Sequence, residues 1–439
     1  MKKERDNNSY WHILKYTGIF GGVQGLNILV GVVRNKFTAL FLGTSGMGLL
    51  ALFNSTLSFL SSSCNFGIPT SGVQVVAESH DKVCLVRSVC LLSALLGVVV
   101  CLVIGGASSF GASHSLHFLL LAPTVFFTIL AGGEMAILKG LGKLRQQAIL
   151  ASVLALLSLL FSVPIYGCFG ERGIMAVLFL LAFSQWLLSF LCLRRVVPFR
   201  LRFSRSMLIA CLPMIRMGGS FVVSGMMSSG AELLVRAFLG WRGNLSEVGL
   251  FNAGVTIVLV YAGMIFSVMD ADYYPRLSAV GGSRRGAEAV KARNAIINRQ
   301  LEVNVLLAVP VVLLLVVFLP YLLPLLYNRD FLGVLGMAQV ASVGLLFRAV
   351  YLPIEYIPLS RGDAKVFLVQ ESCAVILLVV SEIGGYLLFG LTGIGAGILV
   401  AYLLESIGVF FLSRRYYGYR ISLDGWRWLV RIFRITLQR

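Results

Sequence analysis

Long apolar runs alternate with short polar stretches along this 439-residue chain. A run of about 20 apolar residues can cross a bilayer core of about 30 Å as a helix, because an α-helix rises roughly 1.5 Å per residue. The polar interruptions predict twelve such spans, at residues 13–33, 46–67, 84–106, 115–138, 147–168, 174–193, 213–238, 248–270, 302–327, 331–353, 366–390 and 393–412. The first span follows a basic stretch that resembles a signal peptide, but no small-residue cleavage site follows it, so we interpret it as a membrane helix.

The composition agrees with this pattern. Apolar residues make up 58% of the chain, charged residues make up 13%, and the mean hydropathy is +0.88. A soluble domain has too little interior to bury so much apolar surface, so lipid must be the solvent for most of it. The sequence therefore predicts an all-α integral membrane protein.

The formal net charge of +18 follows the predicted topology. The N-terminus, every second loop, the C-terminus and the span ends next to them together hold 29 of the 37 Lys and Arg residues. Cytoplasmic loops carry such an excess, so this distribution predicts that both termini lie in the cytoplasm. Because the topology accounts for the charge, we predict no nucleic-acid partner.

An internal repeat divides the chain into two halves. The segment "YGCFGERGIMAVL" from Tyr166 matches "YLLFGLTGIGAGI" from Tyr386, 220 residues later. Upstream, "EMAILKGLGK" is echoed by "EYIPLSRGDAK", which suggests that Glu134 and Glu355 occupy equivalent positions. Arg34 precedes a Leu-Gly pair, as Arg236 does in the second half. These ordered matches predict two homologous halves.

The repeat predicts a transporter architecture. Each half would hold six spans, an even number, so the two lobes would be parallel and related by an axis along the membrane normal. We predict an N-terminal lobe at 1–193, a basic cytoplasmic linker at 194–212, a C-terminal lobe at 213–412 and a basic tail at 413–439. Rocking of one lobe against the other would expose a central cleft to alternate sides of the membrane, which is alternating access.

Basic residues within or beside the spans are candidates for a cationic cleft. Arginine offers a planar fork of donors that matches phosphate oxygens, so these residues suit a phosphate-bearing or acidic substrate. The candidates are Arg34, Lys36, Arg216, Arg236 and Arg348. Alternatively, Arg34 and Arg236 reach the membrane interface, and Arg236 pairs with Glu232 four residues earlier on the same helix face.

Acidic residues in the spans are candidates for a coupling site. A carboxyl group in a membrane is costly unless it is paired, protonated or wet, so such residues often carry a coupling proton or cation. The candidates for proton or sodium coupling are Glu134, Glu355, Glu371 and Glu382, with Glu405 also buried by its position in the sequence. A solvated helix end or an interhelical ion pair is the alternative for each of them.

The remaining motifs do not indicate a cofactor, a metal site or an enzyme. Asp270 and Asp272 have the spacing of a metal-binding pair but stand alone, and His114 and His117 lack a third ligand. The eight cysteines form no CxxC pair, and no phosphate-cradling loop or nucleophile elbow occurs. The tail "ISLDGWRWLVRIFRITLQR" predicts an amphipathic helix that contacts anionic membrane lipids.

Five segments carry a resemblance to a known family. They are "RNKFTALFLGTSGMGLL" from Arg34, "DADYYPRLSAV", "NRQLEVNVLLAVPVVLLL", "LLPLLYNRDF" and "LPIEYIPLSRGDAKVFL". Their order and spacing, over nearly the whole chain, resemble those of the Wzx-type O-antigen flippases. These belong to the polysaccharide transporter family of the multidrug/oligosaccharidyl-lipid/polysaccharide exporter superfamily.

The resemblance implies a flippase of the bacterial inner membrane. Its substrate would be an undecaprenyl-diphosphate-linked oligosaccharide, moved from the cytoplasmic to the periplasmic leaflet, and its partners would include a polysaccharide polymerase and a chain-length regulator. Arg34 matches the first-span arginine that related lipid II flippases place in their central cavity. Two alternatives stay open: a cation-coupled multidrug exporter, and a membrane glycosyltransferase, polymerase or ligase, which the short predicted outer loops disfavour.

Overall fold

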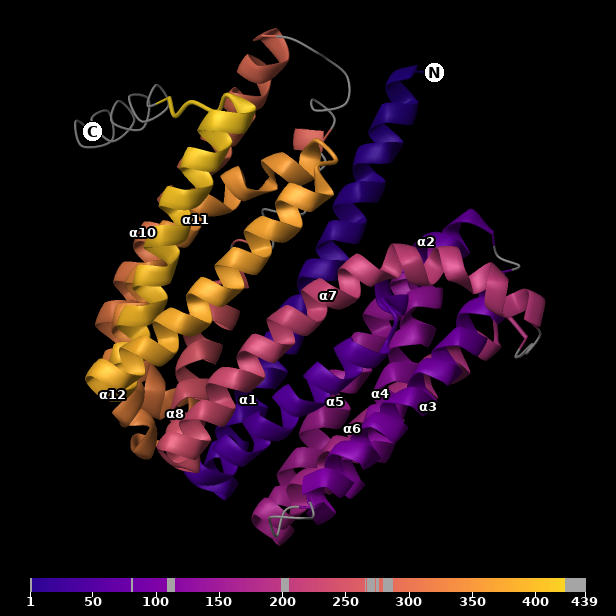
Figure 1. Ribbon diagram of the computed structural model, residues 1–439, viewed down its shortest axis with the longest axis vertical. Coiled ribbons are helices and arrows are strands. Elements are labelled where there is room, and N and C mark those ends of the chain that lie inside the picture. Colours follow the sequence, from indigo (N-terminus) through magenta and orange to yellow (C-terminus); the bar gives the residue numbers. More distant parts are fainter. Residues whose placement is uncertain are drawn as a thin grey trace. The chain divides into compact units, whose positions relative to one another are not determined.

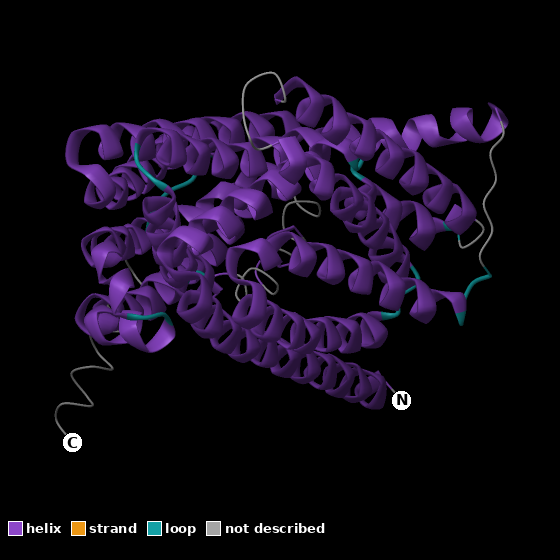
Figure 2. Cartoon of the chain, turned by 90° about the horizontal axis from the view of Figure 1, so that it is seen from below, coloured by secondary structure: helices purple, strands orange, loops and turns teal. Residues whose placement is uncertain are grey.

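The computed structural model describes residues 2–79, 82–108, 115–198, 205–264, 266, 273, 276–278 and 287–422. Over these residues the chain folds into helices joined by short loops, and no strand occurs among them (Figure 2). The all-α prediction is therefore confirmed. The residues His114, Asp270 and Asp272 and the predicted tail helix beyond residue 422 lie outside the described part.

The chain divides into two compact units, Met1–Arg236 with Leu326–Asn328, and Ala237–Leu325 with Arg329–Arg439. In the first unit α4 packs against α2, α3 and α6, and α1 packs against α5 (Figure 1). Its helices are α1 (Lys2–Cys64), α2 (Ile68–Glu78), α3 (Val83–Ser108), α4 (Ser115–Gly140), α5 (Leu144–Phe169), η2 (Gly170–Gly173), α6 (Ile174–Arg194) and most of α7 (Arg205–Arg242). Side chains such as Leu60, Val86 and Val125 form its apolar core.

In the second unit, packing between α11 and α12 is the most extensive contact, because α12 folds back on itself at a kink (Figure 1). The helices of this unit are α8 (Leu245–Val255), the π-helix η3 (Thr256–Ala262), α10 (Ala287–Leu326), η4 (Arg329–Val334), α11 (Leu335–Ser360) and α12 (Ala364–Tyr417). A buried cluster that includes Ile354, Ile357 and Val409 joins α11 to the second part of α12.

Nine helical stretches among the described residues are long and apolar enough to cross a membrane. Two of them, 145–194 and 365–417, contain two predicted spans each, and a third, 25–64, covers parts of two. Large apolar side chains on these helices are exposed, among them Leu160 and Val317, as expected for a surface that lipid covers. The chain is therefore a multi-pass membrane protein, and the number of twelve spans stays a prediction.

Two turns in the two units have the same backbone structure at an offset of 220 residues. The turn between α4 and α5 contains Gly142 with φ +69°, and the turn between α11 and α12 contains Gly362 with φ +78°. The glycine N–H donates to the carbonyl three residues earlier, at 2.9 Å for Gly142 and 3.1 Å for Gly362. The N–H of the residue after the glycine donates to the carbonyl five residues earlier, at 3.0 Å in both turns. Equal geometry at equal spacing supports the internal duplication.

The same offset relates two further glycines, at the end of each repeated helix. Gly170, which follows α5, has φ +56° and ψ −135°, and Gly390, within α12, has φ +61° and ψ −146°. Such angles are open almost only to glycine. The second half therefore kinks where the first half ends its helix, which fixes the repeat register at 220 residues.

We expect Gly142→Ala and Gly362→Ala each to lower the free energy of unfolding by about 1–2 kcal/mol, because a Cβ is disfavoured at positive φ. An added Cβ would meet no atom within 4 Å at either site, so the cost is purely conformational. Thermal unfolding in detergent measures it. Gly384→Ala, at a helical glycine with similar space, is the control and should not lower stability. Equal melting temperatures for all three variants would contradict this account.

Candidate binding and coupling residues

A cluster of carboxyl groups lies between α11 and the two parts of α12, within the second unit. Glu355 of α11 is 8% exposed. Its carboxyl group lies close to those of Glu371 and Glu405. Because like charges so close together disfavour full ionisation, this cluster is a candidate for binding a proton.

Arg348 and two buried tyrosines complete this carboxyl cluster. The guanidinium carbon of Arg348 lies 5.9 Å from the centroid of the Tyr402 ring, and its charge acts on Glu355 and Glu405. The Tyr351 hydroxyl is hydrogen-bonded to the Glu405 carboxyl. One cation among three carboxyl groups leaves an excess of acidic groups, which suits a site for an exchangeable proton.

The first half has no such cluster at the equivalent positions. At the offset of 220 residues, the counterparts of Arg348, Glu355, Glu371 and Glu405 are Thr128, Met135, Ala151 and Gln185. None of these four counterparts is ionisable. The repeated helix packing therefore does not require the charges, and the carboxyl cluster is a specific feature of the second half. Glu382 is 5% exposed and lies within electrostatic range of Tyr402, and its counterpart is Ser162.

Glu134 lies in a different environment, in the first unit. Both of its oxygens accept from Arg87 of α3, from Nε at 3.1 Å and from Nη2 at 3.2 Å. The two side chains are only 3% and 7% exposed, and Arg87 also donates to the carbonyl of Pro198 at 3.1 Å. At the offset of 220 residues the counterpart of Glu134 is Ile354. The predicted equivalence of Glu134 and Glu355 is therefore wrong by one residue, which on a helix is about 100° of rotation.

The basic candidates have distinct partners. Half-buried Arg34 lies within electrostatic range of the buried Tyr166. Lys36 donates to the backbone carbonyl of Tyr327, and both residues belong to the first unit. Arg236 pairs with Glu232 at 2.7 Å, as the alternative from the sequence suggested.

Arg34 therefore differs from Lys36 and Arg236. It lies near a tyrosine, whereas the other two bind a backbone carbonyl and a carboxylate. Arg216 lies on α7, and its side chain is outside the described part. Arg348 belongs to the carboxyl cluster of the second unit. The role of the five residues in a common cationic cleft stays a prediction.

Solved structures of low sequence identity have the same fold. An inward-facing multidrug resistance MATE family transporter of the MOP superfamily matches with a TM-score of 0.72 and 16% identity, over 91% of this chain and 97% of that one. The lipid II flippase MurJ in an inward closed conformation matches with a TM-score of 0.71 and 14% identity, over 95% and 92%. A MOP superfamily transporter from Pyrococcus furiosus matches with a TM-score of 0.54 and 14% identity, over 91% and 95%. The chain therefore has the fold of these transporters.

A family model narrows this class. The model described as "Polysaccharide biosynthesis protein" matches residues 13–280, which is more than half of the chain. The chain therefore belongs to the polysaccharide biosynthesis protein family. This confirms, at the level of the family, the resemblance to polysaccharide flippases that the sequence shows. No curated protein matches the sequence.

Proposed function

We propose that this protein moves an undecaprenyl-diphosphate-linked oligosaccharide from the cytoplasmic to the periplasmic leaflet of the bacterial inner membrane, by alternating access. The observation that carries the proposal is the combination of a polysaccharide biosynthesis family with a transporter fold that is also found in a lipid II flippase. A diphosphate and several sugars cannot cross hydrocarbon unaided, because each buried polar group costs several kcal/mol, roughly 2–7 without a compensating hydrogen bond.

Arg34 is the residue that we assign to the diphosphate. Its side chain is half-buried on a membrane helix, and a guanidinium group can bind two phosphate oxygens at once. Lys36 and Arg236 already bind a carbonyl and a carboxylate, so their charges are engaged within the protein. We assign the coupling proton to the carboxyl cluster of Glu355, Glu371 and Glu405.

Reconstituted vesicles test the proposal. The wild type should transfer a fluorescent undecaprenyl-diphosphate glycan between leaflets and leave its mass unchanged. Arg34→Ala should slow the transfer about tenfold or more, because the lost charge-assisted hydrogen bonds are worth about 1.5–3 kcal/mol. Lys82→Ala, at an exposed pair with Glu78 on the same unit, is the control and should transfer normally. Normal transfer by Arg34→Ala would remove Arg34 from the site, and no transfer by the wild type would refute the flippase.

A cation-coupled multidrug exporter is the second candidate, favoured by the MATE family fold and by the acidic carboxyl cluster. It predicts that vesicles accumulate an organic cation when a proton gradient is imposed, whether or not the glycan lipid is present. Accumulation of the cation without glycan transfer would replace the first proposal. A change in the glycan's mass would instead indicate an enzyme.

A further inference from the structure

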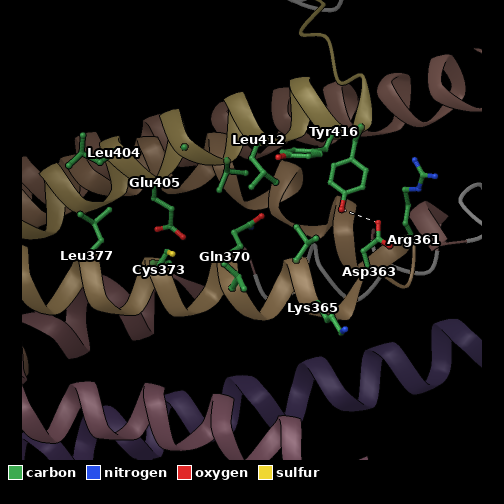
Figure 3. Close-up of a pocket in the computed structure, with 16 residues that line it drawn as sticks. Arg361, Asp363, Lys365, Gln370, Cys373, Leu377, Leu404, Glu405, Leu412 and Tyr416 are labelled. Atoms are coloured by element: carbon green, nitrogen blue, oxygen red, sulfur yellow. Dashed lines mark hydrogen bonds between the residues drawn. The ribbon is translucent and has the colours of Figure 1, made fainter.

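A cavity of about 730 Å³ lies between the two parts of α12, in the second unit (Figure 3). Its walls are largely apolar, and they include Val369, Leu377, Leu404 and Leu412. Val369 and Leu404 are 62% and 45% exposed, so the cavity is open to the surroundings along part of its length. The volume falls within the range of roughly 300–1,000 Å³ that is typical of small-molecule sites.

Two polar side chains interrupt this apolar wall (Figure 3), Glu405 of the carboxyl cluster and Gln370, and Gln370 is the one that lacks a hydrogen-bond partner in the described part of the chain. The side chain is 8% exposed, and among the described residues neither its Nε2 nor its Oε1 has a hydrogen-bond partner. Leaving a buried amide unpaired costs about 1–3 kcal/mol, so a ligand that satisfies it would be favoured. The repeat shows that the fold does not need glutamine here, because the counterpart 220 residues earlier is Leu150, a buried leucine.

One end of the cavity is basic. Arg361, Asp363 and Lys365 lie at this end (Figure 3), and Tyr417 also lines the cavity. The Asp363 carboxylate accepts from the Tyr417 hydroxyl at 3.0 Å, and the Arg361 guanidinium lies 5.6 Å from the Tyr417 ring centroid. Lys365 is exposed. Two cations against one carboxylate, which already accepts a hydrogen bond, make this end complementary to an anion.

We propose that this cavity binds an anionic glycerophospholipid, as a site separate from the oligosaccharide site. The phosphate contacts Lys365 and Arg361, the ester region contacts Gln370, and one acyl chain lies along Leu377, Leu404 and Leu412. Lys365 and Gln370 are five residues apart, roughly 7.5 Å along the helix axis and about 140° around it, so the long Lys365 side chain reaches the phosphate from the edge of the cavity. Leu377 lies roughly 18 Å along the axis from Lys365, on the same helix face as Gln370. A glycerophospholipid has the same order of groups: a phosphate, an ester carbonyl a few bonds away, and then a hydrocarbon chain.

The amide at Gln370 selects this ligand over a polyprenyl phosphate. An isoprenoid chain has no polar atom beyond its phosphate, so it would leave the amide unpaired. An ester carbonyl accepts from the amide N–H, and water that hydrates the ester can donate to Oε1. On the predicted topology the basic end faces the cytoplasm, so the lipid would come from the cytoplasmic leaflet.

The exposed thiol of Cys373 lines the cavity and reports on its occupancy, while the exposed thiol of Cys168, on α5 of the other unit, is an internal control. The full-length protein in detergent is treated with N-ethylmaleimide at rising concentrations of phosphatidylglycerol, and each cysteine is quantified by peptide mass spectrometry. We expect phosphatidylglycerol to slow alkylation of Cys373 and to leave Cys168 unchanged. Gln370→Leu and Lys365→Gln should each raise the lipid concentration for half protection about tenfold.

Three results would overturn the site. The first is that phosphatidylglycerol does not protect Cys373. The second is equal protection by phosphatidylethanolamine, which would remove the charge argument. The third is equal protection by a polyprenyl phosphate, which would assign the cavity to an isoprenoid chain. The matched control is Arg145→Gln, since Arg145 is the exposed counterpart of Lys365 in the first half, and it should keep full protection. The melting temperature of each variant shows that it is folded.

Discussion

We expect Arg87→Met to lower the free energy of unfolding by about 3–5 kcal/mol, because it leaves the Glu134 carboxylate buried without its partner. In the first unit both Glu134 oxygens accept from Arg87, at 3.1 and 3.2 Å, and both side chains are almost completely buried. Arg87→Met removes the donors and retains most of the apolar stem. Thermal unfolding in detergent, followed by intrinsic fluorescence, measures the loss.

The double variant Arg87→Met/Glu134→Leu separates structure from coupling. Replacing both members of a buried ion pair by apolar residues is often neutral, so we expect it to recover most of the lost stability. Lys82→Met, which breaks the exposed pair with Glu78, is the control and should change stability by only about 0–1 kcal/mol. If the stable double variant still transports, then Glu134 is not a coupling residue. Loss of transport with full stability would show that it is one, and no loss of stability in Arg87→Met would contradict the buried pair.

The helices were predictable because the lipid solvent imposes one rule on every span. Each must be long and apolar and must satisfy its own backbone, so length and composition identify it. The sequence predicts a break between two spans near Gly43, and the backbone leaves the helical conformation at this glycine, with φ +64° and ψ −166°. Two helical parts of α1 meet there at a kink. The sequence does not show that the break is a kink at one residue rather than a longer loop.

The contacts of the candidate site were less predictable than the residues in it. Glu134, Glu355, Glu371 and Glu382 could be found as acidic residues in apolar runs, but their partners depend on helix rotation. The one-residue error in aligning Glu134 with Glu355 is the clearest case, since the first is paired with Arg87 and the second lies among carboxyl groups.

Other functional features had no clear signal in the sequence. The bond from Lys36 to the Tyr327 carbonyl joins residues 291 positions apart. Gln370 stands in the sequence beside Glu371 and Ser372, and its unpaired amide becomes evident only once the cavity is known. The internal repeat offered one usable hint, because Leu150 stands at its equivalent position.

We expect Glu355→Gln to uncouple transport from a proton gradient while the protein stays folded. Glutamine keeps the shape of the side chain, but it cannot take up or release a proton at pH 5–8. In vesicles with an imposed pH gradient, the rate of substrate transfer by the variant should therefore no longer respond to the gradient. A gradient that contributes at least about 1.4 kcal/mol would place this rate about tenfold or more below the coupled wild-type rate. Proton movement, followed by a pH-sensitive dye, should fall in parallel.

The groups around Glu355 decide how this result is read. Arg348, Glu371 and Glu405 all act on its charge, and Glu405 is hydrogen-bonded to Tyr351. Glu371→Gln should have the same effect if the two carboxyl groups share one proton. Glu288→Gln, at an exposed carboxylate on α10 of the same unit, is the control and should remain coupled. A Glu355→Gln protein that follows the proton gradient as the wild type does would exclude the carboxyl cluster as the coupling site, and a response to a sodium gradient alone would replace the proton by sodium.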